Sequence, residues 1–274
     1  MPKNNIIGVF DSGLGGLTVL NELLKIIPNY HYIYLGDNAR VPYGNKSREL
    51  IYEYTRQAVD FLFQKGAHLI IIACNTASAE ALRTIQQNYL PKRWPGRRVL
   101  GVIRSVAEFA AQTKGINKIG IIGTKATITS QTYPIEIHKL NPKIIVQQTS
   151  APLLVPIVEE GWEKKAEAKS ILKQYLLPLK KKSVQALILG CTHYPFLINE
   201  TKKIMGPKCL VPHPGNIVAK SLKNYLERHP ELEITPRQSP QLTFYTTDQP
   251  AQFKKLGEKF LKRKIKDIQQ INLI

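Results

Sequence analysis

Short runs of aliphatic residues alternate along the chain with longer stretches whose apolar positions recur at helical spacing. Continuously apolar runs are typical of parallel strands buried on both faces, and the amphipathic stretches between them, such as residues 50–65, are typical of crossover helices. The pattern predicts strands at residues 6–10, 32–35, 69–73, 99–103, 118–122, 144–146 and 186–189. We therefore expect an α/β fold with mostly parallel sheets.

Polar and reactive residues gather directly after these runs. In parallel α/β sheets ligands bind beyond the carboxyl ends of the strands, so chemistry is expected at these positions. They comprise residues 11–16 (DSGLGG), 36–38 (GDN), 74–76 (CNT), 123–124 (GT) and 190–193 (GCTH). Cys74 and Cys191 have similar surroundings, with an aliphatic strand before each and a threonine shortly after it. This echo suggests two related α/β units that each contribute one thiol to a shared cleft.

The glycine-rich segment 11–16 follows the first predicted strand and opens a helix predicted at residues 17–25. Glycines let the backbone approach an anion, and free amides at a helix N-terminus can hold a phosphate or a carboxylate. The dinucleotide fingerprint is not matched, because Thr18 stands where its third glycine is required. The segment favours a small anion or carboxylate over a nucleotide. The alternative is a tight strand-to-helix turn capped by Asp11 or Ser12.

The sequence contains three cysteines, Cys74, Cys191 and Cys209, with no CxxC pair, so we expect free thiols. A zinc site needs about four nitrogen or sulfur ligands, but no second cysteine or histidine lies near Cys74 in the sequence and Cys191 has only His193, so no metal is expected. Two thiols on opposite faces of one substrate carbon would allow inversion, one as thiolate removing a proton and the other as thiol donating one. A single buried cysteine is also commonly an inert core residue. Cys209, followed by Leu210 and Val211, lacks the strand-end context of the other two and is assigned to packing.

The chain has 274 residues, of which 43% are hydrophobic and 22% charged, values typical of a globular protein large enough for two domains. No apolar run approaches the roughly 20 residues that cross a bilayer. The first residues lack the apolar segment and cleavage site of a signal peptide. We therefore expect a cytoplasmic protein.

The net charge of +19 is compatible with a nucleic-acid or anionic-surface function. The basic residues are spread along the chain, however, and no nucleic-acid-binding motif is present. The densest clusters, residues 180–182 and 262–264, lie at predicted helix ends, where cations complement the helix dipole. We expect a solvated basic surface.

Six segments together resemble the glutamate racemase family, cofactor-independent enzymes that supply D-glutamate for peptidoglycan. They are FDSGLGGLTVL (10–20), YLGDNARVPYGNKS (34–47), IIACNTASAEAL (71–82), GIIGTKATITS (120–130), PLLVPIVEEG (152–161) and LGCTHYPFL (189–197). The resemblance implies two similar doubly wound α/β domains with the active site in the cleft between them. We place the first domain at residues 1–98 plus 212–274 and the second at 99–211. Aspartate racemases of the same superfamily are the nearest alternative.

The same resemblance assigns roles to individual residues. It implies that Cys74 and Cys191 are the proton-transfer pair, with Cys74 acting on D-glutamate and Cys191 on L-glutamate. Asp11 would assist Cys74, His193 would assist Cys191, and Glu159 is the other acidic residue of the family site. The implied substrate contacts are Asp11, Ser12, Tyr43, Gly44, Asn75, Thr76, Thr192 and His193. The resemblance implies no cofactor and no metal, and a homodimer that takes glutamate as its substrate; nucleic-acid or gyrase binding is an alternative that no motif supports.

Two segments depart from the family pattern. Arg104-Ser105-Val106 stands where many relatives have Glu-Pro-Gly, and His213-Pro214 stands where an aspartate is common. The first change removes a carboxylate and a turn and adds a cation near a predicted strand end. Neither change touches the proposed proton-transfer residues.

Overall fold

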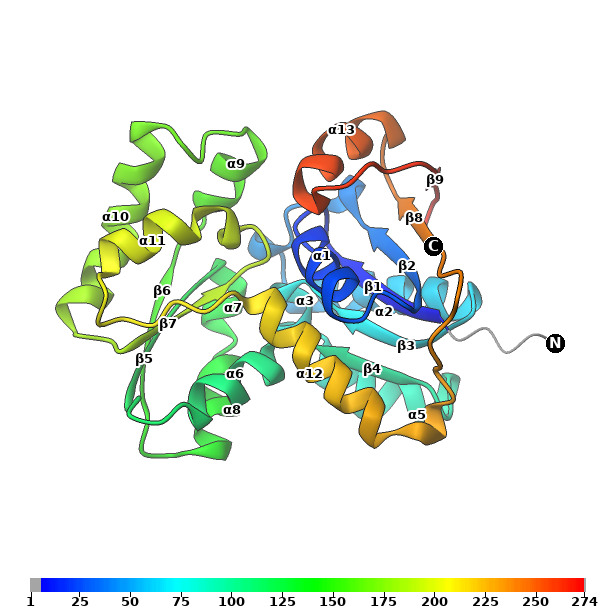
Figure 1. Cartoon of the computed structure of the whole chain (residues 1–274), viewed down its shortest axis with the longest axis horizontal. Coiled ribbons are helices and arrows are strands. Elements are labelled where there is room, and N and C mark those ends of the chain that lie inside the picture. Colours follow the sequence, from blue (N-terminus) through cyan, green and yellow to red (C-terminus); the bar gives the residue numbers. More distant parts are fainter. Residues whose placement is uncertain (1–5, 274) are drawn as a thin grey trace.

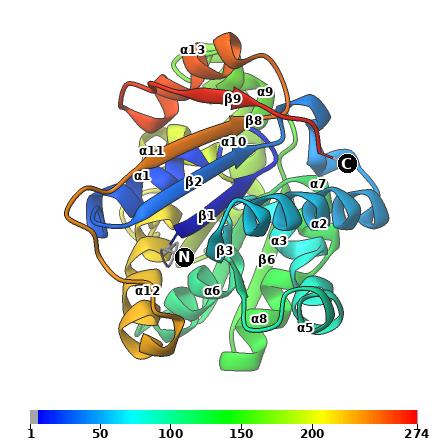
Figure 2. The ribbon, with the colours of Figure 1, turned by 90° about the vertical axis from the view of Figure 1, so that its right-hand side faces the viewer.

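A computed structural model describes residues 6–273 of the chain as two parallel sheets with helices packed around and between them. The larger sheet has the strand order β4-β3-β1-β2-β8-β9, and Figure 2 shows β9, β8, β2, β1 and β3 side by side. The smaller sheet has the order β6-β5-β7. All of these pairings are parallel, which confirms the predicted α/β class. The strands are β1 (Ile6–Asp11), β2 (His31–Gly36), β3 (Ala67–Ile72), β4 (Arg98–Gly101), β5 (Lys118–Gly123), β6 (Ile145–Ser150), β7 (Ala186–Gly190), β8 (Leu242–Thr246) and β9 (Ile268–Gln270).

Helices connect successive strands, and α1, α3 and α12 lie between the two sheets in Figure 1. No helix between residues 6 and 273 has the length and apolarity required to cross a bilayer. The α-helices are α1 (Leu17–Ile26), α2 (Arg48–Gln64), α3 (Asn75–Glu80), α4 (Leu82–Thr84), α5 (Leu90–Arg93), α6 (Val102–Gln112), α7 (Lys125–Thr129), α8 (Thr132–Leu140), α9 (Leu154–Glu159), α10 (Ala166–Lys181), α11 (Ile198–Met205), α12 (Pro214–Arg228) and α13 (Pro250–Leu261). Short 3-10 or π segments are η1 (Asn38–Arg40), η2 (Tyr43–Asn45), η3 (Ile85–Tyr89), η4 (Tyr194–Leu197) and η5 (Pro230–Leu232).

The central strands of the larger sheet are buried on both faces. Ile7 and Val9 of β1 belong to one apolar cluster, whereas Phe10 belongs to a second cluster on the opposite face. This two-sided burial explains why the strand reads as a continuous apolar run rather than an alternating one. The first cluster also contains Ile119 and Ile121 of β5, so the hydrophobic core is continuous between the two sheets.

One predicted strand and one predicted boundary need correction. The apolar run 99–103 is a strand only as far as Gly101, and Val102 begins helix α6. A Cβ at position 101 would lie 2.5 Å from the Leu82 side chain, so the chain turns at a residue that has none. Because β4 pairs with β3 up to Gly101, residues 99–101 belong to the larger sheet, whereas the predicted boundary assigned them to the second domain. The division of the chain into a first domain of residues 1–98 plus 212–274 and a second domain of residues 99–211 stays a proposal, with residues 99–101 moved to the first domain.

The remaining differences concern sheet edges. The run 144–146 was expected to be buried on both faces, but β6 is an edge strand and Ile145 is 51% exposed. Strands β8 and β9 were not predicted, because β8 (LTFYT) combines threonine and aromatic residues rather than an aliphatic run and β9 has only three residues. Of these three strands, β6 and β9 lie at sheet edges, and edge strands bury less apolar surface, so their sequence signal is weaker.

The strand register aligns the carboxyl ends of neighbouring strands, and so brings together the polar segments that follow them. Asp11 at the end of β1 pairs with Gly36, and Phe10 pairs with Ile72, two residues before Cys74. In the smaller sheet Gly123 pairs with Gly190, so residues 124 and 191 leave the sheet together. The chain therefore presents its polar strand ends at one edge of each sheet, as predicted for parallel α/β sheets.

Candidate active site

Cys74 lies directly after β3 and caps the N-terminus of helix α3. Its Sγ accepts a hydrogen bond from the Ala77 N–H at 3.4 Å and lies 3.4 Å from the Ser12 hydroxyl oxygen. The side chain is buried, with 5% of the residue exposed. Burial and the negative charge of Asp11 raise the pKa of Cys74 to about 12, although the contacts with Ser12 and Ala77 act in the opposite direction. At neutral pH Cys74 is therefore a protonated thiol.

Cys191 lies directly after β7, beside a histidine that is hydrogen-bonded to a carboxylate. Its Sγ is 3.8 Å from His193 Nδ1, and His193 Nε2 is 3.0 Å from Glu159 Oε1 at the end of α9. Burial lowers the pKa of His193, but its contacts with Cys191 and Glu159 outweigh burial and raise the pKa to about 10. At neutral pH the imidazole is protonated and donates to Glu159. A positive charge thus stands next to the sulfur of Cys191.

The two thiols have different electrostatic surroundings although both are almost completely buried. Cys74 faces the charge of Asp11, whereas Cys191 faces the imidazolium of His193. The charge of Cys191 also contributes to the raised pKa of Cys74, so the two sulfur atoms interact electrostatically. Cys74 thus lies beside a negative charge that keeps it protonated, whereas Cys191 lies beside a positive charge.

Asp11 is fully buried and contacts the segment that follows Cys191. Its carboxylate accepts the Gly13 N–H at 3.0 Å and the Thr192 hydroxyl at 3.3 Å, and it also accepts from the Gly16 N–H. Burial raises its pKa, against the opposing charge of His193. Among residues 6–273 it has no hydrogen bond with Cys74, so it acts on that thiol through its charge. Asp11 thus ties together the glycine-rich turn through the Gly13 and Gly16 N–H groups, but it does not cap helix α1, whose N-cap is Gly16.

The glycine-rich turn packs closely against the loop that follows β7 and carries Cys191. A Cβ at Gly15 would lie 2.2 Å from Thr192 Oγ1 and 2.6 Å from His193 Nδ1, closer than real Cβ atoms approach. The Thr18 hydroxyl donates to the Thr192 carbonyl oxygen at 2.9 Å. Only glycine therefore allows the two loops to meet at this distance.

The predicted substrate contacts lie in this region, but not all of their side chains are free. The Tyr43 hydroxyl donates to Asp37 and the residue is buried, so a contact at this position falls to the backbone. Gly44 lies against Thr124, where a Cβ would be 2.8 Å from the threonine Cβ. The structure thus places η2 against the residues that directly follow β5.

The hydroxyl groups of Thr76, Thr124 and Thr127 form a buried ring that joins the residues after β3 to those after β5. Of the three, the sequence predicted only Thr76 as a site residue. Thr76 Oγ1 lies 2.9 Å from Thr124 Oγ1 and 3.3 Å from Thr127 Oγ1, and the last two are 3.0 Å apart. Thr124 was visible as a residue after a predicted strand. Thr127 lies one helical turn later, a spacing that puts both hydroxyls on one side of α7.

Comparison with known proteins agrees with this geometry. A model of the Asp/Glu/Hydantoin racemase family matches residues 7–214. A glutamate racemase from Geobacter metallireducens is 38% identical over 268 residues, covering 97% of this chain and 96% of that protein. The chain belongs to the glutamate racemase family. It is an amino-acid racemase, an enzyme of the isomerase class.

Solved structures of other glutamate racemases have the same architecture as this racemase. That of Francisella tularensis, crystallised with D-glutamate, has a TM-score of 0.89 and 38% identity and covers 99% of this chain and 98% of its own. An isoform from Bacillus anthracis has a TM-score of 0.92 and 35% identity with the same coverage. The predicted resemblance and the two-domain α/β fold are therefore confirmed.

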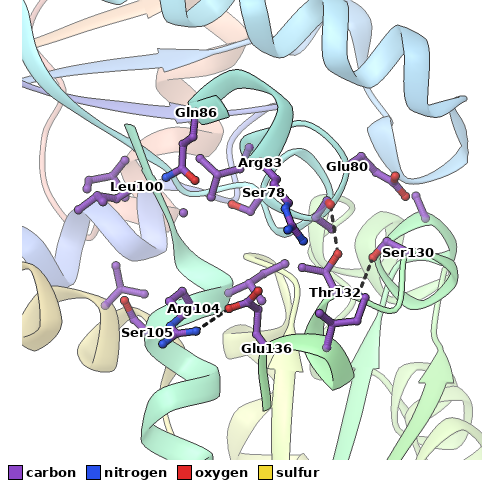
Figure 3. Close-up of a pocket in the computed structure, with 18 of the residues that line it drawn as sticks. Ser78, Glu80, Arg83, Gln86, Leu100, Arg104, Ser105, Ser130, Thr132 and Glu136 are labelled. Carbon is purple, nitrogen blue, oxygen red and sulfur yellow. Dashed lines mark hydrogen bonds and ion pairs between the residues drawn. The ribbon is translucent and has the colours of Figure 1, made fainter. Parts of the chain in front are cut away.

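A groove of about 1240 Å³ lies apart from the two thiols of this racemase (Figure 3). It is lined by parts of α3, α4, α6, α7, α8 and α12, and of the predicted site residues only Gly44 reaches it. A much smaller cavity of about 10 Å³ adjoins Asn75, Cys191 and Thr192. That volume is no larger than one water molecule needs. The thiols of the racemase therefore lie in a nearly closed site.

The departures from the family pattern have local roles outside this site. Arg104 lies in the first turn of α6 and pairs with Glu108 at 2.7 Å and Glu136 at 2.8 Å on the wall of the groove (Figure 3). Ser105 donates to the Ser221 hydroxyl at 3.0 Å and so joins α6 to α12. His213 directly precedes α12, and burial lowers its pKa.

Two further sequence interpretations concern the racemase's chemistry. Cys209 is buried in the apolar core, where burial raises its pKa to about 11, in agreement with a packing role. Within residues 6–273, no three His, Cys, Asp or Glu side chains gather in an arrangement that could hold a metal ion.

Proposed function

We propose that this racemase interconverts L- and D-glutamate without a cofactor, by proton transfer between Cys74 and Cys191. The observation that carries the proposal is the pair of buried thiols at facing strand ends, one beside a carboxylate and the other beside an imidazolium. Its membership of the glutamate racemases supports glutamate as the substrate.

In the L-to-D direction, the thiolate of Cys191 removes the α-proton of L-glutamate. The Cα–H bond breaks, an S–H bond forms at Cys191, and the electron pair stays on the substrate as a carbanion with enolate character. The thiol of Cys74 then donates its proton to the opposite face of Cα and becomes a thiolate. His193 stabilises the starting thiolate of Cys191, and the contacts from Ser12 and Ala77 stabilise the thiolate that Cys74 becomes.

The reverse reaction uses the same groups with their roles exchanged. The Cys74 thiolate removes the α-proton of D-glutamate, and the Cys191 thiol protonates the other face. The carboxylate of Asp11 makes the Cys74 thiolate a stronger base because it raises the pKa of that thiol. A strong base is useful because the α-carbon of an amino acid is only weakly acidic.

A water-poor cleft with fixed donors favours the charge that develops on the substrate. Cys74 and Cys191 are 5% and 6% exposed, so bulk water is largely excluded. The side chains of Ser12, Asn75 and Thr76 and the backbone N–H groups of Tyr43 and Gly44 supply hydrogen-bond donors for two carboxylates, whereas the Thr192 hydroxyl already donates to Asp11. Such donors bind anions through hydrogen bonds, in addition to the positive charge that His193 places beside Cys191.

We further propose that the enzyme works in the cytoplasm as a homodimer and supplies D-glutamate for peptidoglycan synthesis. The resemblance of its six motifs to those of the glutamate racemases supports this role. Size-exclusion chromatography with light scattering tests the dimer, and a monomer at micromolar concentration would contradict it.

The activity is tested by incubating the purified protein with L-glutamate in the absence of added cofactor and resolving the products by chiral chromatography. We expect D-glutamate to appear until the enantiomers are equal, with much slower conversion of L-aspartate. In D₂O, initial label should enter mainly the product enantiomer, as a two-base mechanism requires. No D-glutamate from the wild-type protein, or faster conversion of aspartate, would overturn the proposal.

A further inference from the structure

Tyr133 is a buried residue that neither the family motifs nor the mechanism above uses, yet it contacts one of the predicted substrate residues. Its hydroxyl donates to Asn75 Oδ1 at 2.7 Å. Tyr133 belongs to α8, which follows the smaller sheet's β5, whereas Asn75 is the first residue of α3, directly after Cys74. The bond therefore joins the two halves of the molecule inside the active site.

The ring of Tyr133 also lies against the strand that leads to Cys191. A Cβ at Gly190 would be 3.2 Å from Tyr133 Cε2, so the ring occupies the space beside the residue that precedes the thiol. Burial and the charge of Cys191 raise the pKa of Tyr133. The phenol stays protonated at neutral pH and acts as the donor in its bond with Asn75.

The bond determines which end of the Asn75 amide is available. An amide has an accepting oxygen and a donating NH₂ group, which are interchangeable by a flip of the side chain. Tyr133 occupies the oxygen, and the NH₂ group has no acceptor among the described residues. Asn75 lines the small cavity that Cys191 and Thr192 also line. Asn75 and the reacting Cys191 therefore share the wall of one cavity.

We propose that Tyr133 is a positioning residue that holds the amide of Asn75 so that its NH₂ group, and not its carbonyl oxygen, faces a carboxylate of the substrate. The inference rests on the proposed racemisation of glutamate. Without the phenol the amide can flip, and the carbonyl oxygen then opposes the carboxylate. Substrate binding weakens, while the thiols and their partners keep their places.

A matched variant separates this role from a simple loss of stability. The Tyr32 hydroxyl also makes one buried bond, to the Ile27 carbonyl oxygen at 2.9 Å, but far from the thiols. Tyr32→Phe and Tyr133→Phe each remove one buried tyrosine hydroxyl and its bond. Only the second removes the group that orients Asn75.

Steady-state racemisation is measured for the wild type, Tyr133→Phe, Tyr32→Phe, Asn75→Ala and the double variant Tyr133→Phe/Asn75→Ala. We expect Tyr133→Phe to raise KM for glutamate about tenfold, with kcat changed less than about threefold, because the lost interaction is one of binding. Tyr32→Phe should leave KM unchanged. The double variant should match Asn75→Ala within about twofold, because the phenol acts only through that amide.

An unchanged KM in Tyr133→Phe, or effects that multiply in the double variant, would overturn the proposal. If the wild type does not racemise glutamate, the proposed function fails; if it does and the KM effect is missing, only the role of Tyr133 fails.

A second variant tests the orientation without removing the tyrosine bond. Asn75→Asp keeps an acceptor for the Tyr133 hydroxyl but replaces the NH₂ group with an oxygen. Isothermal titration with D-glutamate should show weaker binding than in Asn75→Ala, because the new oxygen repels a carboxylate. Binding as tight as in the wild type would mean that the NH₂ group does not face the substrate, and the proposal would be wrong.

Discussion

Glu159 Oε1 lies 3.0 Å from His193 Nε2, and this contact connects helix α9 to the loop that carries Cys191. The carboxylate is one of the two groups that hold the pKa of His193 at about 10, above its ordinary value of 6.5. A group whose pKa is raised on folding stabilises the folded state fully below its unfolded pKa. That contribution is lost as the pH rises through the folded pKa.

We therefore expect the free energy of unfolding of the wild type to decline between about pH 6.5 and pH 10. In Glu159→Gln the pKa of His193 should fall, so the decline should be smaller and should end at lower pH. Urea denaturation at intervals across this range measures both. As a control, Glu231→Gln removes the exposed partner of His229, and its profile should follow that of the wild type. An unchanged profile in Glu159→Gln would show that Glu159 does not set the charge of His193.

Exchange of the α-hydrogen of each glutamate enantiomer with solvent should distinguish the roles of Cys74 and Cys191. In Cys74→Ala, Cys191 can still remove the α-proton of L-glutamate but no group protonates the opposite face. We expect racemisation to fall by at least about a thousandfold while the α-hydrogen of L-glutamate still exchanges with D₂O. Cys191→Ala should show the same loss with exchange of D-glutamate only. Proton NMR of each enantiomer measures the exchange.

Cys209→Ala is the matched control, since it removes a buried thiol from the core and not from the site. It should keep racemisation within about twofold of the wild type, with some loss of stability from the smaller side chain. Exchange of both enantiomers in either active-site variant would contradict the assignment of one thiol to each face.

Asp11 should control the ionisation of Cys74 by its charge. Replacing the carboxylate in Asp11→Asn removes a negative charge that raises the pKa of Cys74, so the pKa should fall from about 12 while burial keeps it above the ordinary value. Thiolate absorbance during a pH titration measures this in a Cys191→Ala/Cys209→Ala background. A pKa that stays the same or rises would contradict this electrostatic role.

The sequence predicted the strand ends well because the residues change from aliphatic to polar or reactive where each strand leaves the sheet. Asp11, Cys74 and Cys191 were found in this way, since each follows an aliphatic run. The beginning of α6 was missed because Val102 and Ile103 are as apolar as the strand before them. The close approach of Leu82, which leaves no room for a Cβ at Gly101, is a contact that the sequence does not reveal.

Contacts between the two halves could not be predicted, because they depend on how the sheets dock. The bond from Thr192 to Asp11 and the bond from Tyr133 to Asn75 join residues that are distant in the sequence. The resemblance assigned Tyr43 to the substrate, yet its hydroxyl is bound to Asp37. A motif identifies a position, whereas the structure determines whether the side chain or the backbone is available there.

A single methyl group added at Gly15 should disturb the packing of the glycine-rich turn against the loop that carries Cys191. Gly15→Ala would place a Cβ 2.2 Å from Thr192 Oγ1 and 2.6 Å from His193 Nδ1, so one loop must move. We expect a loss of about 1–3 kcal/mol in the free energy of unfolding and at least about a tenfold loss of kcat, because overpacking displaces His193 from Cys191.

Gly13→Ala is the control in the same turn, where the nearest atom, on Val41, would be 3.1 Å away. Urea denaturation and the racemisation assay should show a smaller effect on both quantities for Gly13→Ala. Equal effects of the two variants on kcat would mean that the contact of Gly15 with the Cys191 loop does not position the catalytic groups.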